Sequence, residues 1–457
     1  MFIGRDAELK KLNEMYSSDE YEFAVIYGRR RVGKTTLIRE FIKDKKAIFF
    51  VSGESTAADN LLSLSRRIGG STNSPVYRDY EDALSAIFEK AGNERIIFVI
   101  DEYPYLAGSY PGVSSLLQIM IDHNRENTKL MLILCGSSMS FMENQVLGYQ
   151  SPLYGRRTAQ FKIMPFSFFE SLPFFEPFDK TDKAVLYGIT SGIPEYLTKI
   201  DSKKTVEDNI VDLFLTASGH LFEEPSNLLK QELREPSTYN VIIEAIASGA
   251  TRLNEIATKC GIESNKCAKY LKSLISLGIV KKELPITETS SKKSIYLLDD
   301  LMFRFWYRFV FPNMSGIVSG LGRAIYDYEV TENLSAYMGL VFEDICKQYL
   351  IEEASRHTLP FFTGKAGRWW GNNPIEKRQE EIDILAYRKD SALFCECKWT
   401  TAPVDIDVLN ALEAKSGLFH YKSKWFWLFA KTGFTDRLIN EAETRGSVRL
   451  IKFDEMF

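Results

Sequence analysis

Residues 28–35 read Gly-Arg-Arg-Arg-Val-Gly-Lys-Thr. The stretch matches GxxxxGK[ST], a loop whose glycines let the backbone turn tightly and aim its N–H groups at phosphates. An apolar run at 23–27 precedes it, and a helical pattern at 36–42 follows. A strand, this loop and a helix in that order predict a nucleotide-binding site, because the helix N-terminus adds positive partial charge. A glycine-rich turn without a ligand is the simpler alternative.

Within this loop, Lys34 is predicted to bridge the terminal phosphates and Thr35 to ligate Mg²⁺. The expected ligands are therefore ATP and Mg²⁺. Backbone or side-chain contacts to the nucleotide are expected from the whole segment: Gly28, Arg29, Arg30, Arg31, Val32, Gly33, Lys34, Thr35 and Thr36.

A second motif lies at 95–102, where an apolar strand ends in Asp101 and Glu102. Asp101 is expected to hold the Mg²⁺ through water, and Glu102 to orient and deprotonate the attacking water. Hydrolysis is therefore expected as well as binding. A further apolar run at 130–135 leads to Ser137, whose hydroxyl could sense the γ-phosphate, although a plain turn explains it almost as well.

Composition and charge limit the class of protein. The chain has 457 residues, 45% hydrophobic and 26% charged, which is ordinary for a globular protein of about three domains. A net charge of −4 gives no field that would attract nucleic acid to the whole chain. The six cysteines show no disulfide spacing, and neither a signal peptide nor a membrane-length apolar run is recognised. A cytoplasmic protein with no membrane association is expected.

The order of patterns predicts a multidomain α/β protein. Residues 1–165 alternate strands and helices, as in a parallel sheet covered by helices, and 166–235 are mainly helical. Residues 236–300 read as three helices and a hairpin, the order of a winged helix-turn-helix. Residues 301–457 open with an aromatic run predicted to be a packing helix, and continue with a helix and several strands.

Lysines follow one side of the predicted third helix of 236–300. Lys266, Lys269 and Lys272 lie opposite an apolar face formed by Cys267, Tyr270, Leu271, Leu274 and Ile275. Lys281, Lys282, Lys292 and Lys293 flank the hairpin. These lysines could neutralise DNA phosphates. A solvated helix face, in a module that acts as an internal lever, is an equally good interpretation.

Carboxylates interrupt two apolar strands near the end of the chain. Strict alternation along 381–385 and 394–398 would direct Asp383, Glu396 and Lys398 at one spot. Hard oxygen ligands suit Mg²⁺ or Mn²⁺, and Lys398 would stabilise developing negative charge on a phosphodiester. Glu343, on a predicted helix, could add a third carboxylate. A structural Glu–Lys pair is the alternative.

Between that helix and these strands, residues 364–371 combine basic residues with Trp369 and Trp370. The combination suits backbone contact with stacked bases. A hairpin with packed tryptophans is as plausible.

The order of motifs resembles archaeal-type P-loop ATPases that carry a C-terminal domain related to PD-(D/E)XK nucleases and lie between AAA+ and STAND ATPases. The opening residues 2–9 are similar to that family's start near the adenine, which implies contacts from Phe2, Gly4 and Arg5. The segment 151–157 resembles a family motif whose arginine, Arg156 or Arg157, reaches the γ-phosphate. Pro194 matches a nucleotide-contacting proline turn, and the nuclease pattern maps to Glu343, Asp383, Glu396 and Lys398.

The resemblance implies an ASCE-type sheet with the sensor strand between the two nucleotide-binding strands, then a helical lid, a winged helix and a restriction-endonuclease-like core. It implies an ATPase that directs a DNA-binding or DNA-cutting domain. The alternative is an ATP-driven regulatory switch whose last two domains are non-cutting interaction modules. DNA is the expected partner, and a protein partner or a homo-oligomer is left open. The first nuclease strand has Glu-Ile-Asp in place of Pro-Asp.

Overall fold

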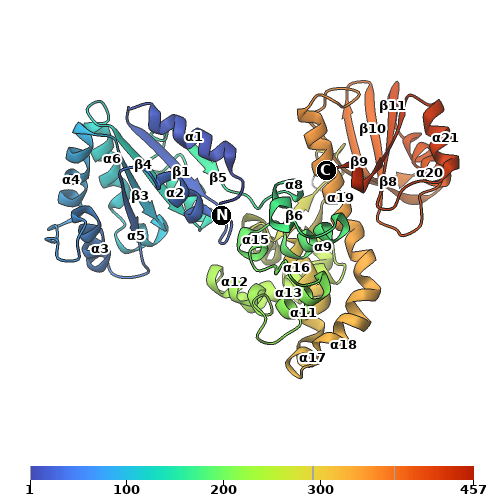
Figure 1. The fold of residues 1–457 in the computed structure, drawn as a ribbon, viewed down its shortest axis with the longest axis horizontal. Coiled ribbons are helices and arrows are strands. Elements are labelled where there is room, and N and C mark those ends of the chain that lie inside the picture. Colours follow the sequence, from blue (N-terminus) through green and yellow to red (C-terminus); the bar gives the residue numbers. More distant parts are fainter. Residues whose placement is uncertain (1, 291–292, 375) are drawn as a thin grey trace. The chain divides into compact units, whose positions relative to one another are not determined.

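The computed structural model describes residues 2–290, 293–374 and 376–457. Its contacts divide the chain into two compact units. The first comprises residues 1–165 with 193–195, and the second comprises 166–192 with 196–457. Each is described by itself (Figure 1).

The first unit is built on a five-stranded parallel sheet of order β2-β3-β4-β1-β5. Its strands are β1 (Glu22–Tyr27), β2 (Ala47–Val51), β3 (Ile96–Asp101), β4 (Leu130–Gly136) and β5 (Ala159–Lys162). β4 lies between β1, which precedes the phosphate loop, and β3, which ends in Asp101. The predicted sensor strand therefore occupies the position that the ASCE-type resemblance implied.

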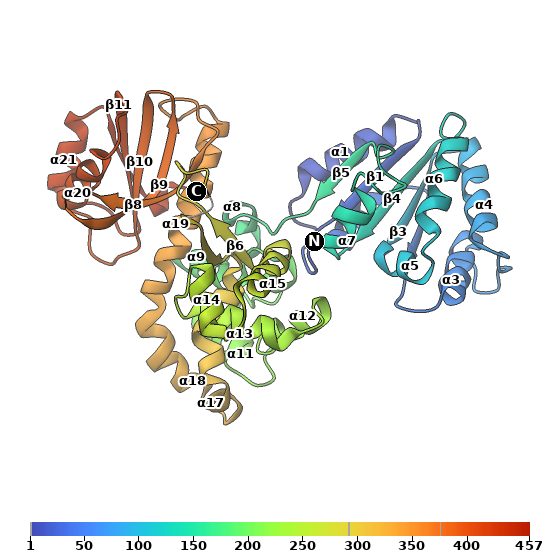
Figure 2. The ribbon, with the colours of Figure 1, turned by 180° about the vertical axis from the view of Figure 1, so that it is seen from behind.

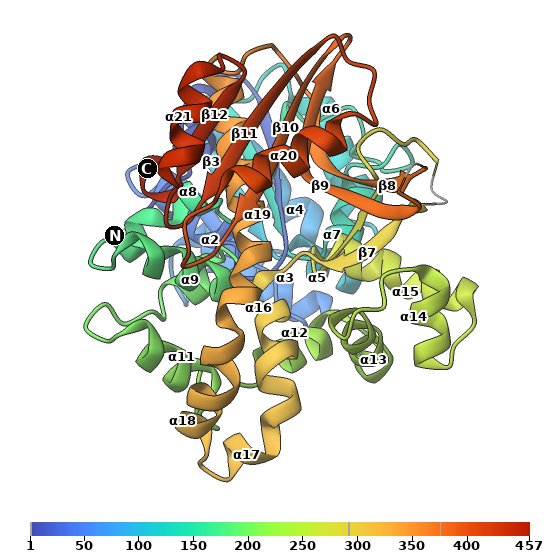
Figure 3. The same ribbon diagram turned by 90° about the vertical axis from the view of Figure 1, so that its right-hand side faces the viewer.

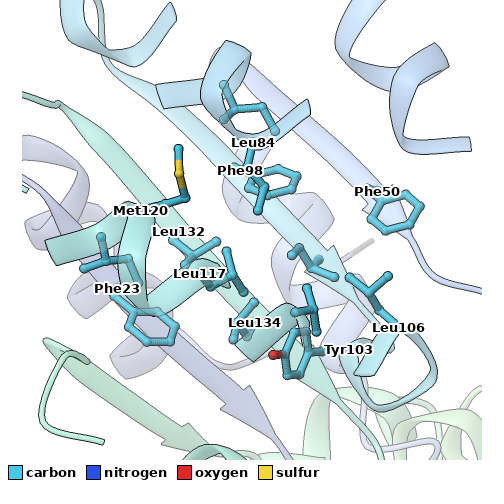
Figure 4. Close-up of a cluster of buried hydrophobic side chains, with 14 of the residues drawn as sticks. Phe23, Phe50, Leu84, Phe98, Tyr103, Leu106, Leu117, Met120, Leu132 and Leu134 are labelled. Atoms are coloured by element: carbon cyan, nitrogen blue, oxygen red, sulfur yellow. The ribbon is translucent and has the colours of Figure 1, made fainter. Parts of the chain in front are cut away.

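Helices cover both faces of this sheet, as its continuously apolar strands require. One buried cluster joins the strands to residues of α3 (Ala57–Gly69), α4 (Tyr80–Asn93), α5 (Tyr103–Ser109) and α6 (Val113–Asn124). Figure 4 shows this cluster, with Phe23, Phe98 and Leu132 from strands against Leu84 and Leu117 from helices. The other face packs against α1 (Asp6–Ser17) and α2 (Lys34–Ile42).

The second unit begins with short helices, which are α8 (Phe168–Ser171), α9 (Lys180–Thr190), α11 (Val206–Phe214) and α12 (Glu224–Glu232). Three helices and a hairpin follow, in the predicted order (Figure 2). They are α13 (Pro236–Ala247), α14 (Leu253–Cys260), α15 (Ser264–Ser276), β6 (Val280–Glu283) and β7 (Ile295–Leu298). The aromatic run forms α16 (Leu301–Phe305) and a π-helical turn, Trp306–Val310, whose Trp306 is fully buried.

The C-terminal part has a mixed sheet of order β12-β11-β10-β9-β8. Its strands are β8 (Ala366–Asn373), β9 (Arg378–Arg388), β10 (Ser391–Lys398), β11 (Ser423–Ala430) and β12 (Val448–Lys452). One face packs on α20 (Ile406–Ser416) and α21 (Asp436–Thr444), and the long helix α19 (Thr331–Ser355) lies behind β10 (Figure 3). The short α17 (Met314–Val318) and α18 (Gly322–Ile325) precede α19.

Candidate functional site

The phosphate loop has the backbone that its glycines were predicted to permit. Gly33 has φ 87°, a left-handed conformation that favours glycine, and α2 begins at the next residue. A Cβ placed on Gly28 would lie 2.3 Å from the carbonyl oxygen of Ile163, so a larger residue cannot fit there without displacing the backbone. These two positions hold the loop between β1, the end of β5 and the start of α2.

Lys34 is buried, and its Nζ donates hydrogen bonds of 2.9 Å to the carbonyl oxygens of Gly28 and Arg29. The ammonium group thus lies inside the turn of the loop, where a phosphate ligand would face it. Arg5, at 9% exposure, donates to the carbonyls of Val32 and Met164.

The start of the chain therefore lies against the phosphate loop. Gly4 and Arg5 both adopt positive φ, and the Phe2 ring packs against the buried cluster on the α1 face of the sheet. In the loop itself, Arg30 donates to the Tyr105 hydroxyl. These contacts place the predicted residues beside the loop, while their contacts with adenine stay a prediction.

The two nucleotide-binding motifs meet through one hydrogen bond. The Thr35 hydroxyl donates to Asp101 Oδ2 at 2.8 Å, although β4 lies between β1, which leads into the loop, and β3, which ends in Asp101. A hydroxyl and a carboxylate at this distance form the pair of oxygens through which Mg²⁺ could be held, directly at Thr35 and through water at Asp101. The residues present therefore fit Mg²⁺-ATP.

Glu102 adopts φ 52° and ψ 44°, which is uncommon for a residue other than glycine, asparagine or aspartate. Its Oε2 accepts hydrogen bonds from the Ser137 hydroxyl at 2.9 Å and from the Ser137 backbone N–H at 3.4 Å. Its own N–H donates to Asp101 Oδ1 at 3.0 Å. The sequence placed Ser137 near the phosphates, but its contact with Glu102 is visible only in three dimensions.

Pro194 lies against the phosphate loop from far along the chain. A Cβ placed on Gly33 would be 3.7 Å from Pro194 Cγ, and residues 193–195 belong to the first unit, unlike their neighbours on either side. Pro194 opens a short helix, α10 (Pro194–Leu197).

Arg156 does not lie at the phosphate loop of its own chain. Its guanidinium donates two hydrogen bonds, of 2.6 and 2.8 Å, to the Asp122 carboxylate. Burial raises the pKa of Tyr21, which lies at the amino end of β1, and the positive charge of Arg156 acts to lower it. Thr158, which follows Arg157, bonds to Phe23 at that same end. The loop follows the opposite, carboxyl end of β1, so Arg156 makes no contact with it in the same chain. The charge of Arg157, in contrast, acts on the pKa of Tyr27, the last residue of β1, and its contact with the γ-phosphate stays a prediction.

In the C-terminal sheet, a β-bulge breaks the strict alternation assumed from the sequence. Gly367 pairs with Leu385 and Trp369 with Ile382, so Asp383 and Ile384 together face only Arg368. Asp383 Oδ2 accepts a hydrogen bond of 2.8 Å from the backbone N–H of Cys397. Bulges re-aim side chains, and this one sets the direction of Asp383 independently of the alternation.

Glu396 and Lys398 share one face, as predicted, and their side chains are 2.7 Å apart. A second cation, Lys415 of α20, lies 3.1 Å from the other carboxylate oxygen. The sequence analysis missed Lys415 because only the packing of α20 on the sheet brings it there. Glu396 is therefore held between two ammonium groups, as in the structural alternative.

Glu343 of α19 is paired with Arg368 of β8 at 3.1 Å. Burial, followed by the charge of Asp383, raises the pKa of Glu343 to about 8. Burial, followed by the charge of Glu396, raises the pKa of Asp383 to about 6. The charge of Asp383 thus acts on Glu343, and the charge of Glu396 acts on Asp383. Within the described part of the chain, however, no group of three or more His, Cys, Asp or Glu side chains is arranged to hold a metal.

The tryptophan segment, residues 364–371, was expected either to stack on bases or to form a hairpin with packed tryptophans, and the structure shows a hairpin. It forms β8, antiparallel to β9, and the Trp369 ring packs edge-on against Phe419 with 4.8 Å between centroids. Trp369 is therefore engaged with the core of the sheet.

On α15, Lys266, Lys269 and Lys272 are exposed, and four of the five predicted apolar residues are buried. Ile275 is the exception, at 37% exposure. Lys281 was predicted to be available to a phosphate. Its Nζ instead lies 3.6 Å from the Asp299 carboxylate and 3.5 Å from the Asp344 carboxylate. Lys293 pairs with Glu288, and Lys292 lies outside the described residues.

Comparison with known proteins identifies the family. Residues 2–200 match a family described as an ATPase domain predominantly from Archaea. An uncharacterized protein of Methanocaldococcus jannaschii is 38% identical over 87% of this chain and 88% of its own length. The chain belongs to this archaeal ATPase family. Residues 306–417 match a second family, described as archaeal and bacterial proteins of unknown function.

Two further similarities cover less of the chain or are more distant. An uncharacterized ATP-binding protein of the same organism is 44% identical over 10% of this chain and 78% of its own length. The solved structure of a Walker-type ATPase from Pyrococcus abyssi covers 67% of this chain and 96% of its own, at 21% identity and a TM-score of 0.50. The latter supports the P-loop fold alone. No helix in the described ranges is long and apolar enough to span a membrane.

Proposed function

We propose that the protein binds Mg²⁺-ATP in its first unit, hydrolyses it with Glu102 as the general base, and uses the change of nucleotide state to control a nucleic-acid-directed second unit. The hydrogen bond between Thr35 and Asp101 carries the first half of the proposal, because it joins the two motifs in a pair of oxygens suited to Mg²⁺. Membership of an ATPase family supports the same activity.

Different residues of the first unit would bind the phosphates and activate the water. Backbone N–H groups of the loop and Lys34 would bind the β- and γ-phosphates, and Glu102 would accept a proton from the attacking water. When bound, Mg²⁺ supplies charge neutralisation on the phosphate oxygens. Ser137 holds the Glu102 carboxylate, so it would set the direction from which the base meets the water.

The second half rests on the basic surface of α15 and on the C-terminal carboxylates. Three exposed lysines on one helix after a helix and a turn suit contact with a phosphate backbone. Two carboxylates and a lysine, here Asp383, Glu396 and Lys398, are the residue types that a metal-dependent nuclease site uses. Glu343 and Glu396 already lie against basic side chains, so a divalent metal would have to displace Arg368 or the two lysines to reach them.

That observation favours a second candidate for the same unit, a non-cutting interaction module in an ATP-driven switch. In this case the Glu396–Lys398–Lys415 cluster would stabilise the sheet and Arg368 would be a permanent partner of Glu343. The winged-helix-like module would then act as a lever or as a binding surface.

One experiment tests the proposal and separates these candidates. ATP hydrolysis by the full chain is measured with Mg²⁺, alone and with single-stranded or duplex DNA, and the DNA is analysed for cuts. Hydrolysis that requires Mg²⁺ and changes with DNA supports the proposal. Cuts that disappear in Asp383→Asn assign a nuclease, and DNA-responsive hydrolysis with intact DNA assigns the switch. Absence of hydrolysis under all these conditions would refute the ATPase mechanism.

A further inference from the structure

A cavity of ≈ 270 Å³ lies within the second unit, where its three parts meet. The hairpin strands β6 and β7 and the end of α13 form one side, and α16, α19, β8 and β9 form the other. Among the lining residues are Asp383 and Glu343, two of the carboxylates described above, whereas Glu396 does not line it. The cavity therefore joins the winged-helix-like module to the carboxylates of the C-terminal sheet.

Charged side chains of both signs form the polar lining. Five basic residues line the cavity: Lys281, Arg304, Arg308, Lys347 and Arg368. Four acidic residues also line it: Glu283, Glu343, Asp344 and Asp383. One of these, Asp344, is shared by two cations, since Lys281 lies 3.5 Å and Arg304 3.9 Å from it.

Two of the cations have no acidic partner. Within the described part of the chain, neither Arg308 nor Lys347 has a carboxylate within ion-pair distance, and Arg308 is exposed. The buried Nη1 of Arg304 also has no hydrogen-bond partner there. The Asp344 carboxylate at 3.9 Å is too far from this nitrogen for a hydrogen bond, and buried donors are normally satisfied, so an anionic oxygen in the cavity would complete its bonding.

We propose that this cavity binds the phosphate of a single-stranded nucleic-acid end, with Arg304, Arg308 and Lys347 holding the phosphate next to Asp383. Guanidinium groups bind phosphate oxygens through paired hydrogen bonds, and an ammonium group adds a point charge. The volume is just below the usual range of small-ligand pockets, about 300–1,000 Å³, so it accommodates about one nucleotide and excludes a duplex. This inference rests on the proposed nucleic-acid role of the second unit and names its substrate class.

The test uses the full chain without divalent metal, so that nothing is cut. Binding of a short labelled single strand, and of the duplex of the same sequence, is followed by fluorescence anisotropy in the parent and in Arg308→Ala/Lys347→Ala. Single-strand affinity is expected to fall ~10-fold or more, since charge-assisted hydrogen bonds are lost. The slope of log affinity against log salt should shrink by about 0.7, because the neutralisation of one phosphate is lost. Duplex affinity should change little.

A matched control removes one arginine and one lysine elsewhere in the same unit. Arg437 and Lys203 are exposed and do not line the cavity, so Arg437→Ala/Lys203→Ala should bind like the parent. Equal losses in the two double variants, or equal losses for single strand and duplex, would overturn the proposal. A deoxynucleoside monophosphate or inorganic phosphate that competes as strongly as the strand would also overturn it, in favour of a free-phosphate site.

The failure of this inference can be distinguished from the failure of the proposed function. A parent that binds neither form of DNA contradicts both. A parent that binds DNA, with the affinity unaltered in Arg308→Ala/Lys347→Ala, contradicts only the cavity. A thermal melt of each variant beside the parent confirms that the second unit, which carries the substitutions, remains folded.

Discussion

The Ser137 hydroxyl donates a hydrogen bond of 2.9 Å to the carboxylate of Glu102, and so connects the end of β4 to the residue after β3. The bond engages the proposed general base while Glu102 is held in a left-handed backbone conformation. Ser137 is therefore a positioning residue. The Ser137→Ala variant should lower kcat about 10-fold with little change in KM, because a hydrogen bond to a charged group contributes about 1.5–3 kcal/mol.

Steady-state ATP hydrolysis checks this prediction, and Ser137→Thr, which keeps the hydroxyl, serves as the conservative control. If Ser137→Ala changes only KM, the serine contacts the nucleotide and does not position Glu102.

Glu102→Gln should bind ATP like the parent and lose turnover by about 10²-fold or more, because only the proton acceptor is removed. Binding is measured with a fluorescent ATP analogue and turnover by phosphate release. Turnover at the parent rate would show that another group activates the water.

Lys34→Ala should weaken ATP binding itself. The Lys34 ammonium lies inside the phosphate loop, bonded to the carbonyls of Gly28 and Arg29, and no other side chain is expected to replace it at the β- and γ-phosphates. Titration with the same analogue tests this expectation. Arg39→Ala, on the same helix and beyond the loop, is the control that should keep the parent affinity.

The combined change of Lys266, Lys269 and Lys272 to alanine should lower DNA affinity to a similar extent for unrelated sequences. We expect these lysines to contact phosphates and not base edges, so the salt dependence should also flatten, by about 0.9 per contact on duplex DNA. Anisotropy titrations at several salt concentrations provide the measurement. An unchanged slope would favour the lever interpretation of this module.

The Glu343→Gln variant should be more stable than the parent at high pH. The folded protein raises the pKa of Glu343 to about 8, above the value of about 4.5 in an unfolded chain, mainly through burial. Between these values the folded state binds more protons than the unfolded state, so the Glu343 contribution to stability falls as the pH rises. Below about pH 4.5 the carboxyl is protonated in both states and that loss is absent.

The melting temperatures of Glu343→Gln and parent should therefore be close at pH 5 and diverge towards pH 8.5, with the variant higher. Glu332→Gln, an exposed change on the same helix, controls for a general effect of the lost charge. A difference that stays constant with pH would contradict the assignment to Glu343.

The sequence by itself determined the first unit and its chemistry. The phosphate loop, the acidic strand end and the sensor strand are each contiguous in the chain, and their spacing reflects local backbone requirements such as the positive φ of Gly33. The three helices and the hairpin of 236–300 were equally readable, because helical periodicity and turn residues are local signals. Arg5 and Pro194, which the family resemblance implied at the loop, lie against it, whereas Arg156 does not.

Only the tertiary structure decided which side chains meet from distant parts of the chain. The bulge at Asp383 and the pairing of Glu396 with Lys415 depend on how β8 and α20 pack onto neighbouring strands. The ion pair of Arg156 with Asp122 likewise depends on the position of α6. Strict alternation gave the right face for Glu396 and Lys398 but could not reveal a bulge, since an extra residue in one strand leaves no mark in its own sequence. Such contacts are set by the packing of whole elements, which no local pattern encodes.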